Sequence, residues 1–110
     1  MPKTPLRLFI SYSRTDSAFV DRLEADLKAR SFQPWVDRRK LVAAAGLDWS
    51  AELQKAIEEC QITLVVLSPK AVESKFVRRE YLHADRRGKL IIPLNLLPTD
   101  VPFELNELQW

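Results

Sequence analysis

Glycine, histidine and cysteine are all scarce in this sequence of 110 residues. The two glycines, Gly46 and Gly88, are too few to build the three-glycine dinucleotide fingerprint or a Walker phosphate loop. Cys60 and His83 are the only residues of their kinds, which excludes a zinc site built from cysteine and histidine. A single cysteine also excludes an internal disulfide, so we expect a reducing, cytoplasmic setting.

Long apolar runs and a large excess of one charge are also absent. No stretch approaches the roughly 20 apolar residues of a membrane span, and the first ten residues lack the apolar core of a signal peptide. The chain has 17 basic and 15 acidic residues, a formal net charge of +2, and its paired arginines are dispersed. We therefore expect neither a membrane partner nor direct binding to nucleic acid.

The composition is that of one folded domain. Hydrophobic residues make up 46% of the chain and charged residues 29%, which is typical of a globular protein and too apolar for a disordered one. A chain of this length is long enough for one compact core and short for two. Residues 1–110 are therefore interpreted as a single domain.

Strand and helix patterns alternate along the chain. Apolar and β-branched runs predict strands at residues 6–11, 32–37, 62–68 and 89–96. Helical patterns follow Thr15 or Asp16 as N-cap, begin again near Asp48, and extend from Pro69 to about Arg87, where Gly88 ends them. This order predicts an α/β domain with a parallel sheet and right-handed crossovers.

Polar side chains follow the strands at one edge of the predicted sheet. Open sheets of this kind bind ligands beyond the carboxyl ends of their strands. Tyr12, Arg14, Asp37 and Ser68 all follow strands at that edge. A phosphoacceptor receiver domain shares the strand and helix order, but its acidic residues are missing here. The edge is therefore a candidate ligand site of another kind.

Several segments stand in an order that identifies a family: LFISYSRTD, WVDRRKL with GLDW, ITLVVLSPKAVESKFVRREY and LIIPLNL. In this order they resemble the Toll/interleukin receptor (TIR) domain, especially its bacterial branch. The resemblance implies a flavodoxin-like parallel sheet flanked by helices. Family members continue beyond a segment like LNELQW with a strand and a helix that are lacking here. We therefore expect a domain truncated at its C-terminal end, fused to or partnered by a sensor module.

The segment SKFVRRE matches the feature that separates enzymes from adaptors in this family. The enzymes cleave NAD⁺ at the nicotinamide–ribose bond and have a glutamate four residues after an aromatic. Glu80 and Phe76 match these positions, although tryptophan is commoner than phenylalanine there. The resemblance implies Glu80 as the catalytic carboxylate and Phe76 as the platform for nicotinamide. NAD⁺ is then the substrate, and we expect no resident cofactor and no metal.

A single carboxylate suits this chemistry. Cleavage builds positive charge on the ribose in an oxocarbenium-like transition state, while nicotinamide leaves as a neutral molecule that needs no general acid. Were the helix unbroken from Pro69, however, Glu80 would lie about 17 Å along it, far from the strand edge. We therefore predict a break near residues 73–75, with Ser74 as the N-cap of a second helix.

The resemblance assigns further residues to the dinucleotide site. Tyr12, Ser13 and Arg14 would line it, and the Arg14 guanidinium suits a phosphate. Trp49 either covers the substrate or seals the core. It ends a loop, residues 37–49, that resembles the family's segment for gating and for contacts between domains. This loop departs from the bacterial pattern, because it is longer than usual before Gly46 and lacks the usual proline.

Two functions follow from the resemblance. The first is an NAD⁺ glycohydrolase that self-association of TIR domains activates, in prokaryotic immune defence. The second is a non-catalytic scaffold that binds other TIR domains through loop 37–49. Taken alone, Glu80 reads as a solvated helix residue paired with an arginine, and Phe76 as a core residue. The SKFVRRE match favours the enzyme.

Overall fold

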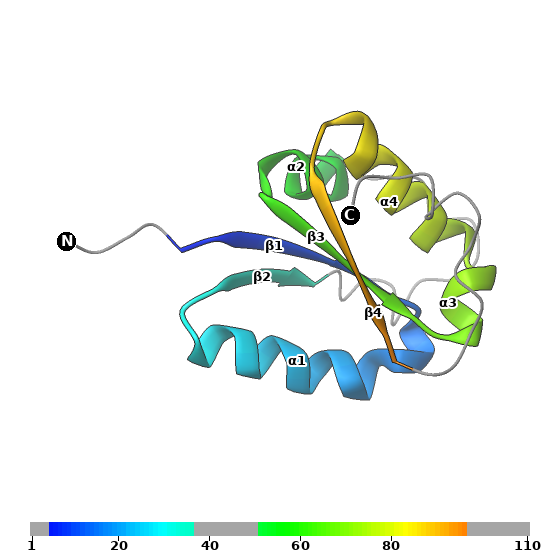
Figure 1. Cartoon of the computed structure of the whole chain (residues 1–110), viewed down its shortest axis with the longest axis horizontal. Coiled ribbons are helices and arrows are strands. Elements are labelled where there is room, and N and C mark those ends of the chain that lie inside the picture. The colour runs from blue at the N-terminus through cyan, green and yellow to red at the C-terminus, as the bar shows by residue number, and fades with distance from the viewer. Residues whose placement is uncertain (1–4, 37–50, 97–110) are drawn as a thin grey trace.

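The structure is a computed structural model that describes residues 5–36 and 51–96 (Figure 1). The described elements are β1 (Arg7–Ser11), a 3-10 turn (Arg14–Asp16), α1 (Ser17–Ala29), β2 (Gln33–Val36), α2 (Ala51–Glu59), β3 (Ile62–Leu67), α3 (Pro69–Glu73), α4 (Lys75–Arg86) and β4 (Leu90–Asn95). The predicted alternation of strands and helices is confirmed. In the described part of the chain, no helix is long and apolar enough to span a membrane.

The strands form one sheet in the order β2-β1-β3-β4, and every neighbouring pair is parallel. β3 lies inside the sheet, and its residues are buried from Thr63 to Leu67, as its continuous apolar run predicts. Pro34 lies in β2, an outer strand of the described sheet, where a missing backbone donor is tolerated. The predicted α/β parallel sheet is confirmed, in the strand order of a flavodoxin-like fold.

Helices cover both faces of the sheet, with α1 on one side and α2, α3 and α4 on the other (Figure 1). Alternate residues of β1 divide between the two cores, as the pleat of a strand requires. Leu8 and Ile10 pack with Val20 of α1, whereas Phe9 packs with Ile57 of α2 and the Cys60 that follows it. Cys60 is buried in the core.

The end of α4 lies against the end of α2. Gly88 follows α4 with a φ of 71°, a left-handed conformation that glycine adopts at little cost, and the chain turns there toward β4. On α2, the Glu58 carboxylate accepts hydrogen bonds from Gln54 at 3.0 Å and from Arg87 at 3.2 Å. Lys89 donates to the Glu58 carbonyl at 2.7 Å. These bonds tie two helices of one layer together at a corner of the domain.

The charge of Glu58 makes this corner dependent on pH. The hydrogen bond from Gln54, together with the charges of Arg87 and His83, lowers the pKa of Glu58 below its ordinary value of 4.5. Because this pKa is lower in the folded state than in the unfolded state, the ionised carboxylate stabilises the fold. Its contribution to the free energy of unfolding is complete above the pKa of the unfolded state, and it is lost as pH falls through the pKa of the folded state.

We therefore expect Glu58→Gln to be less stable than the wild type above the ordinary pKa of Glu58, and the two proteins to become equally stable as pH falls below the lowered pKa. Urea unfolding of both proteins across this range measures the difference. A stability difference that stays constant over the whole range would contradict the assignment.

Candidate functional site

A buried hydrogen bond joins the carboxyl end of β1 to α4. The hydroxyl of Ser11, the last residue of β1, donates to Oε1 of Glu80 at 2.7 Å, and both residues are 0% exposed. Burying a carboxylate is costly unless hydrogen bonds replace its lost hydration, so Ser11 offsets part of that cost. The bond holds the Glu80 carboxylate at the edge of the sheet where parallel α/β folds bind their ligands.

The helix break predicted from Ser74 is confirmed, and it explains how Glu80 reaches this edge. α3 ends at Glu73, and Ser74 has an extended conformation, with φ −79° and ψ 123°. The Ser74 hydroxyl accepts a hydrogen bond from the Val77 amide at 3.2 Å, as the N-cap of α4. Glu80 therefore lies only about 9 Å along the helix axis from Ser74.

A second polar link at the same edge was missed in the sequence. The Ser68 hydroxyl donates to Oδ2 of Asp16 at 2.6 Å and accepts from the Ala71 amide at 3.2 Å. It therefore caps α3 while it ties the turn after β1 to the end of β3. Of the two predicted N-caps of α1, Thr15 and Asp16, the structure has Asp16, but its side chain makes no cap bond there. The parallel pairing of β1 with β3 was the signal that could have placed these residues together.

The three residues expected to line the dinucleotide site differ in their surroundings. Tyr12 is 1% exposed and belongs to the core under α1, whereas a residue that lines a ligand site would be open to it. Ser13 caps the 3-10 turn, and its hydroxyl accepts from the Thr15 amide. Arg14 is exposed, so its guanidinium is available to a phosphate. The ligand roles of all three stay predictions.

Phe76 lies at the first turn of α4, and its side chain is 43% exposed. Val77, Tyr81 and Ala84 form the buried stripe of the helix, and Glu80 is buried with them. Phe76 precedes Glu80 by four residues, a spacing that brings side chains to the same side of a helix. The two side chains nevertheless differ in burial, because Phe76 is open to solvent whereas the Glu80 carboxylate is enclosed. Trp49 and loop 37–49 lie outside the described residues.

The described residues bring a carboxyl group, an aromatic ring and a cation to this edge of the sheet. Among them, no group of three or more His, Cys, Asp or Glu side chains is arranged to hold a metal ion. The Glu80 carboxyl group lies in a dry setting, where a negative charge acts on a developing positive charge more strongly than in water. Phe76 supplies an aromatic face, and Arg14 supplies a cation.

The parallel sheet and its flanking helices define a flavodoxin-like α/β domain, with a candidate site at its carboxyl edge. The family model of the TIR domain matches residues 8–110. The chain therefore belongs to the TIR domain family.

Solved structures agree with this fold. The chain is similar to the TIR domain of the Toll-related receptor TRR-2 from Hydra magnipapillata, with a TM-score of 0.75 and 24% identity over 94% of this chain and 82% of that one. It is also similar to the TIR domains of the activated Roq1 resistosome, which directly recognises the pathogen effector XopQ. That match has a TM-score of 0.66 and 24% identity, over 80% of this chain and 55% of that one. No curated protein matches the chain.

The Ser11–Glu80 bond can be tested by its effect on stability. We expect Ser11→Ala to lower the free energy of unfolding by about 1–3 kcal/mol, because it leaves a buried carboxylate with one hydrogen bond fewer. Urea unfolding of Ser11→Ala, Glu80→Gln and the double variant should give a coupling energy of about 0.5–3 kcal/mol. Additive effects of the two substitutions would mean that the bond does not hold the helix.

Proposed function

We propose that this TIR domain is an NAD⁺ glycohydrolase that becomes active when copies of it associate. The observation that carries the proposal is the Ser11–Glu80 bond, since it holds a carboxylate at the ligand-binding edge of the sheet. Glu80 is also the residue that matches the family's catalytic glutamate. A glutamate that only paired with arginines on the helix surface would be exposed, whereas Glu80 is fully buried.

The roles of the residues follow from the charge that cleavage creates. As the nicotinamide–ribose bond breaks, the ribose gains positive charge, which the Glu80 carboxylate stabilises while it holds a ribose hydroxyl. The nicotinamide ring stacks on Phe76, and the Arg14 guanidinium holds a phosphate, with Ser13 beside it. Tyr12 supports this edge from below.

The complete burial of Glu80 explains why association is needed. A carboxylate that is 0% exposed cannot meet a ribose until the residues around it move. Association can drive this movement if the open state, in which Glu80 is exposed, binds other copies more tightly than the closed state does. A partner shifts an equilibrium between two states only by the difference in its affinity for them. The isolated domain is then nearly inactive, and clustered domains turn over NAD⁺.

The biological setting proposed is prokaryotic immune defence in the cytoplasm, with a fused or partner sensor that brings the domains together. The similarity to the TIR domains of the activated Roq1 resistosome supports association as the trigger. The single buried cysteine suits a reducing compartment.

The decisive experiment measures nicotinamide release from NAD⁺ by artificially clustered protein. We expect Glu80→Gln to lose at least about a hundredfold of the wild-type rate, because the amide is similar in size but carries no charge. Glu73→Gln, at the exposed end of α3, is the matched control and should keep the wild-type rate. Circular dichroism of both variants checks that they fold.

The same assay separates the enzyme from a non-catalytic scaffold. A scaffold associates without releasing nicotinamide at any degree of clustering, and Glu80→Gln then changes only stability. If clustered wild type releases no nicotinamide, or Glu80→Gln releases as much as the wild type, the enzyme proposal is wrong.

Phe76 is tested by its effect on substrate binding. We expect Phe76→Ala to raise KM for NAD⁺ by up to about tenfold, because an aromatic stack is worth roughly 0.5–1.5 kcal/mol. Phe76→Trp should keep the wild-type KM, since it retains the aromatic face. The free energy of unfolding should change little in either variant, as the ring is 43% exposed. Equal KM values for Phe76→Ala and Phe76→Trp would remove Phe76 from the site.

A further inference from the structure

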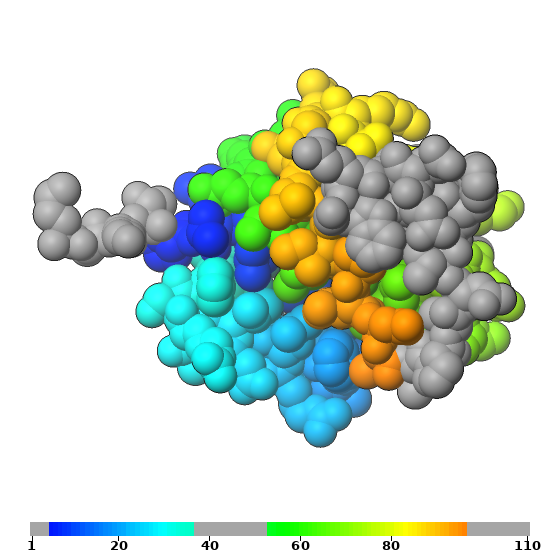
Figure 2. Space-filling model, in the orientation of Figure 1, coloured from blue at the N-terminus to red at the C-terminus, as the bar shows by residue number. Residues whose placement is uncertain are grey.

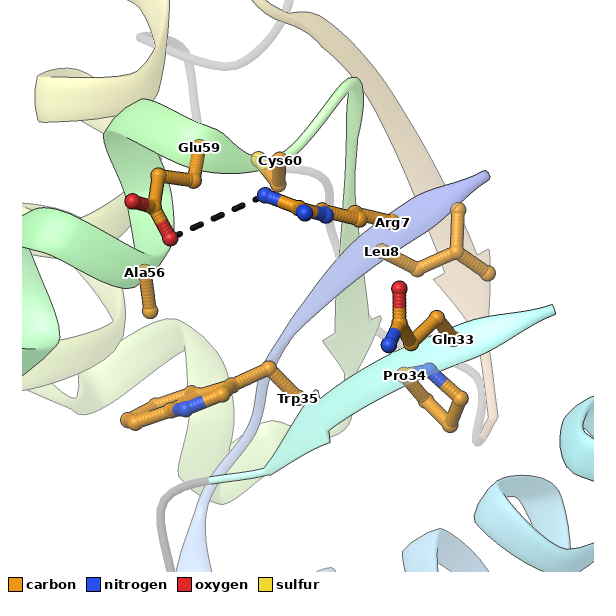
Figure 3. Close-up of a pocket in the computed structure, with 8 residues that line it drawn as sticks. All are labelled: Arg7, Leu8, Gln33, Pro34, Trp35, Ala56, Glu59 and Cys60. Atoms are coloured by element: carbon orange, nitrogen blue, oxygen red, sulfur yellow. Dashed lines mark ion pairs between the residues drawn. The ribbon is translucent and has the colours of Figure 1, made fainter. Parts of the chain in front are cut away.

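A pocket of about 330 Å³ lies at the opposite end of the sheet from Glu80. It opens where β1 and β2 begin and α2 ends, and residues of all three elements line it (Figure 3). Its volume is at the lower limit for sites that hold small molecules, so it has room for a compact ligand of one or two rings. Neither the TIR resemblance nor the proposed NAD⁺ site uses this pocket.

One side of the pocket is aromatic. The Trp35 indole stacks on Phe9, with ring centroids 5.4 Å apart and planes 14° apart, and this stack fixes its orientation. Trp35 is only partly buried, and Figure 3 shows it facing the pocket across from Cys60 and Arg7. Ala56 of α2 adds a small apolar side chain to the wall. A flat ring can therefore extend the aromatic stack at low entropic cost, because its platform is already ordered.

The charges at the mouth favour an anion. The Arg7 guanidinium lies 3.8 Å from Oε1 of Glu59, and the Lys55 ammonium lies 4.0 Å from Oε2 of the same carboxylate. All three side chains are at least half exposed, so both ion pairs are weak and exchange partners easily. Two cations share one carboxylate here. An incoming carboxylate can take Arg7 while Glu59 keeps Lys55.

We propose that this pocket binds a small planar aromatic molecule that carries one anionic group. The ring lies against Trp35, and the anion pairs with the Arg7 guanidinium, whose planar donors match a carboxylate. The site is independent of Glu80 and of the proposed glycohydrolase activity, so the failure of one leaves the other standing.

Three naphthalene derivatives with the same ring and an anionic, a neutral or a cationic substituent test the proposal: naphthoate, naphthamide and naphthylmethylammonium. We expect saturable binding of naphthoate, with naphthamide about tenfold weaker and the ammonium compound weaker still. NMR titration should move the indole N–H signal of Trp35. Equal binding of all three compounds, no saturable binding of naphthoate, or shifts confined to other residues would overturn the proposal.

Cys60 provides a second readout that belongs to this pocket. It is the only cysteine of the chain and lines the pocket, and burial raises the pKa of its thiol. Alkylation by iodoacetamide should therefore be slow, and saturating naphthoate should slow it further. An alkylation rate that naphthoate leaves unchanged would contradict occupation of the pocket.

Two substitutions should change the affinity for naphthoate in opposite directions. This distinguishes an effect on ligand recognition from damage to the fold. Arg7→Gln should weaken naphthoate binding about tenfold, whereas Glu59→Gln should strengthen it, because a competing carboxylate is removed. Arg22→Gln is the matched control, since Arg22 is an exposed arginine of α1, which covers the other face of the sheet. The proposal is wrong if Arg7→Gln binds naphthoate as tightly as Arg22→Gln does.

Discussion

The hydrogen bond between Ser11 and Glu80 joins residues that are 69 positions apart in the chain, and the candidate site depends on it. Each end of the bond is fixed by a separate feature of the fold. Ser11 is held by the pairing of β1 with β3, and Glu80 is held by a helix that begins again at Ser74. The carboxylate therefore lies at the carboxyl edge of the sheet without bulk water around it.

The two ends of the sheet differ in chemistry. At the carboxyl edge, polar links join segments that are far apart in the chain: the Ser11 hydroxyl donates to Glu80, and the Ser68 hydroxyl donates to Asp16. At the amino end, the contacts are half-exposed ion pairs around an aromatic wall, with Trp35 stacked on Phe9. In Figure 2 the amino end of β1 (blue) and α3 (yellow-green) lie at opposite sides of the molecule. A ligand at one end need not compete with a ligand at the other.

Local patterns in the sequence are sufficient to predict the helices and strands and the helix break at Ser74. Ser68-Pro69 and Ser74 are capping signals, and the structure confirms both. Contacts between distant segments could not be predicted in the same way. The Asp16–Ser68 bond and the complete burial of Glu80 depend on register and on how α4 packs, which no local pattern encodes. The pocket beside Trp35 likewise arises only where α2 ends over the sheet.

The central claim is that Glu80 becomes the catalytic carboxylate once association exposes it. The most direct test is an experimental structure of the clustered protein with a non-cleavable NAD⁺ analogue. The account predicts a Glu80 oxygen within about 3.2 Å of a ribose hydroxyl, with the nicotinamide ring on Phe76. An analogue bound elsewhere, with Glu80 still buried against Ser11, would contradict it.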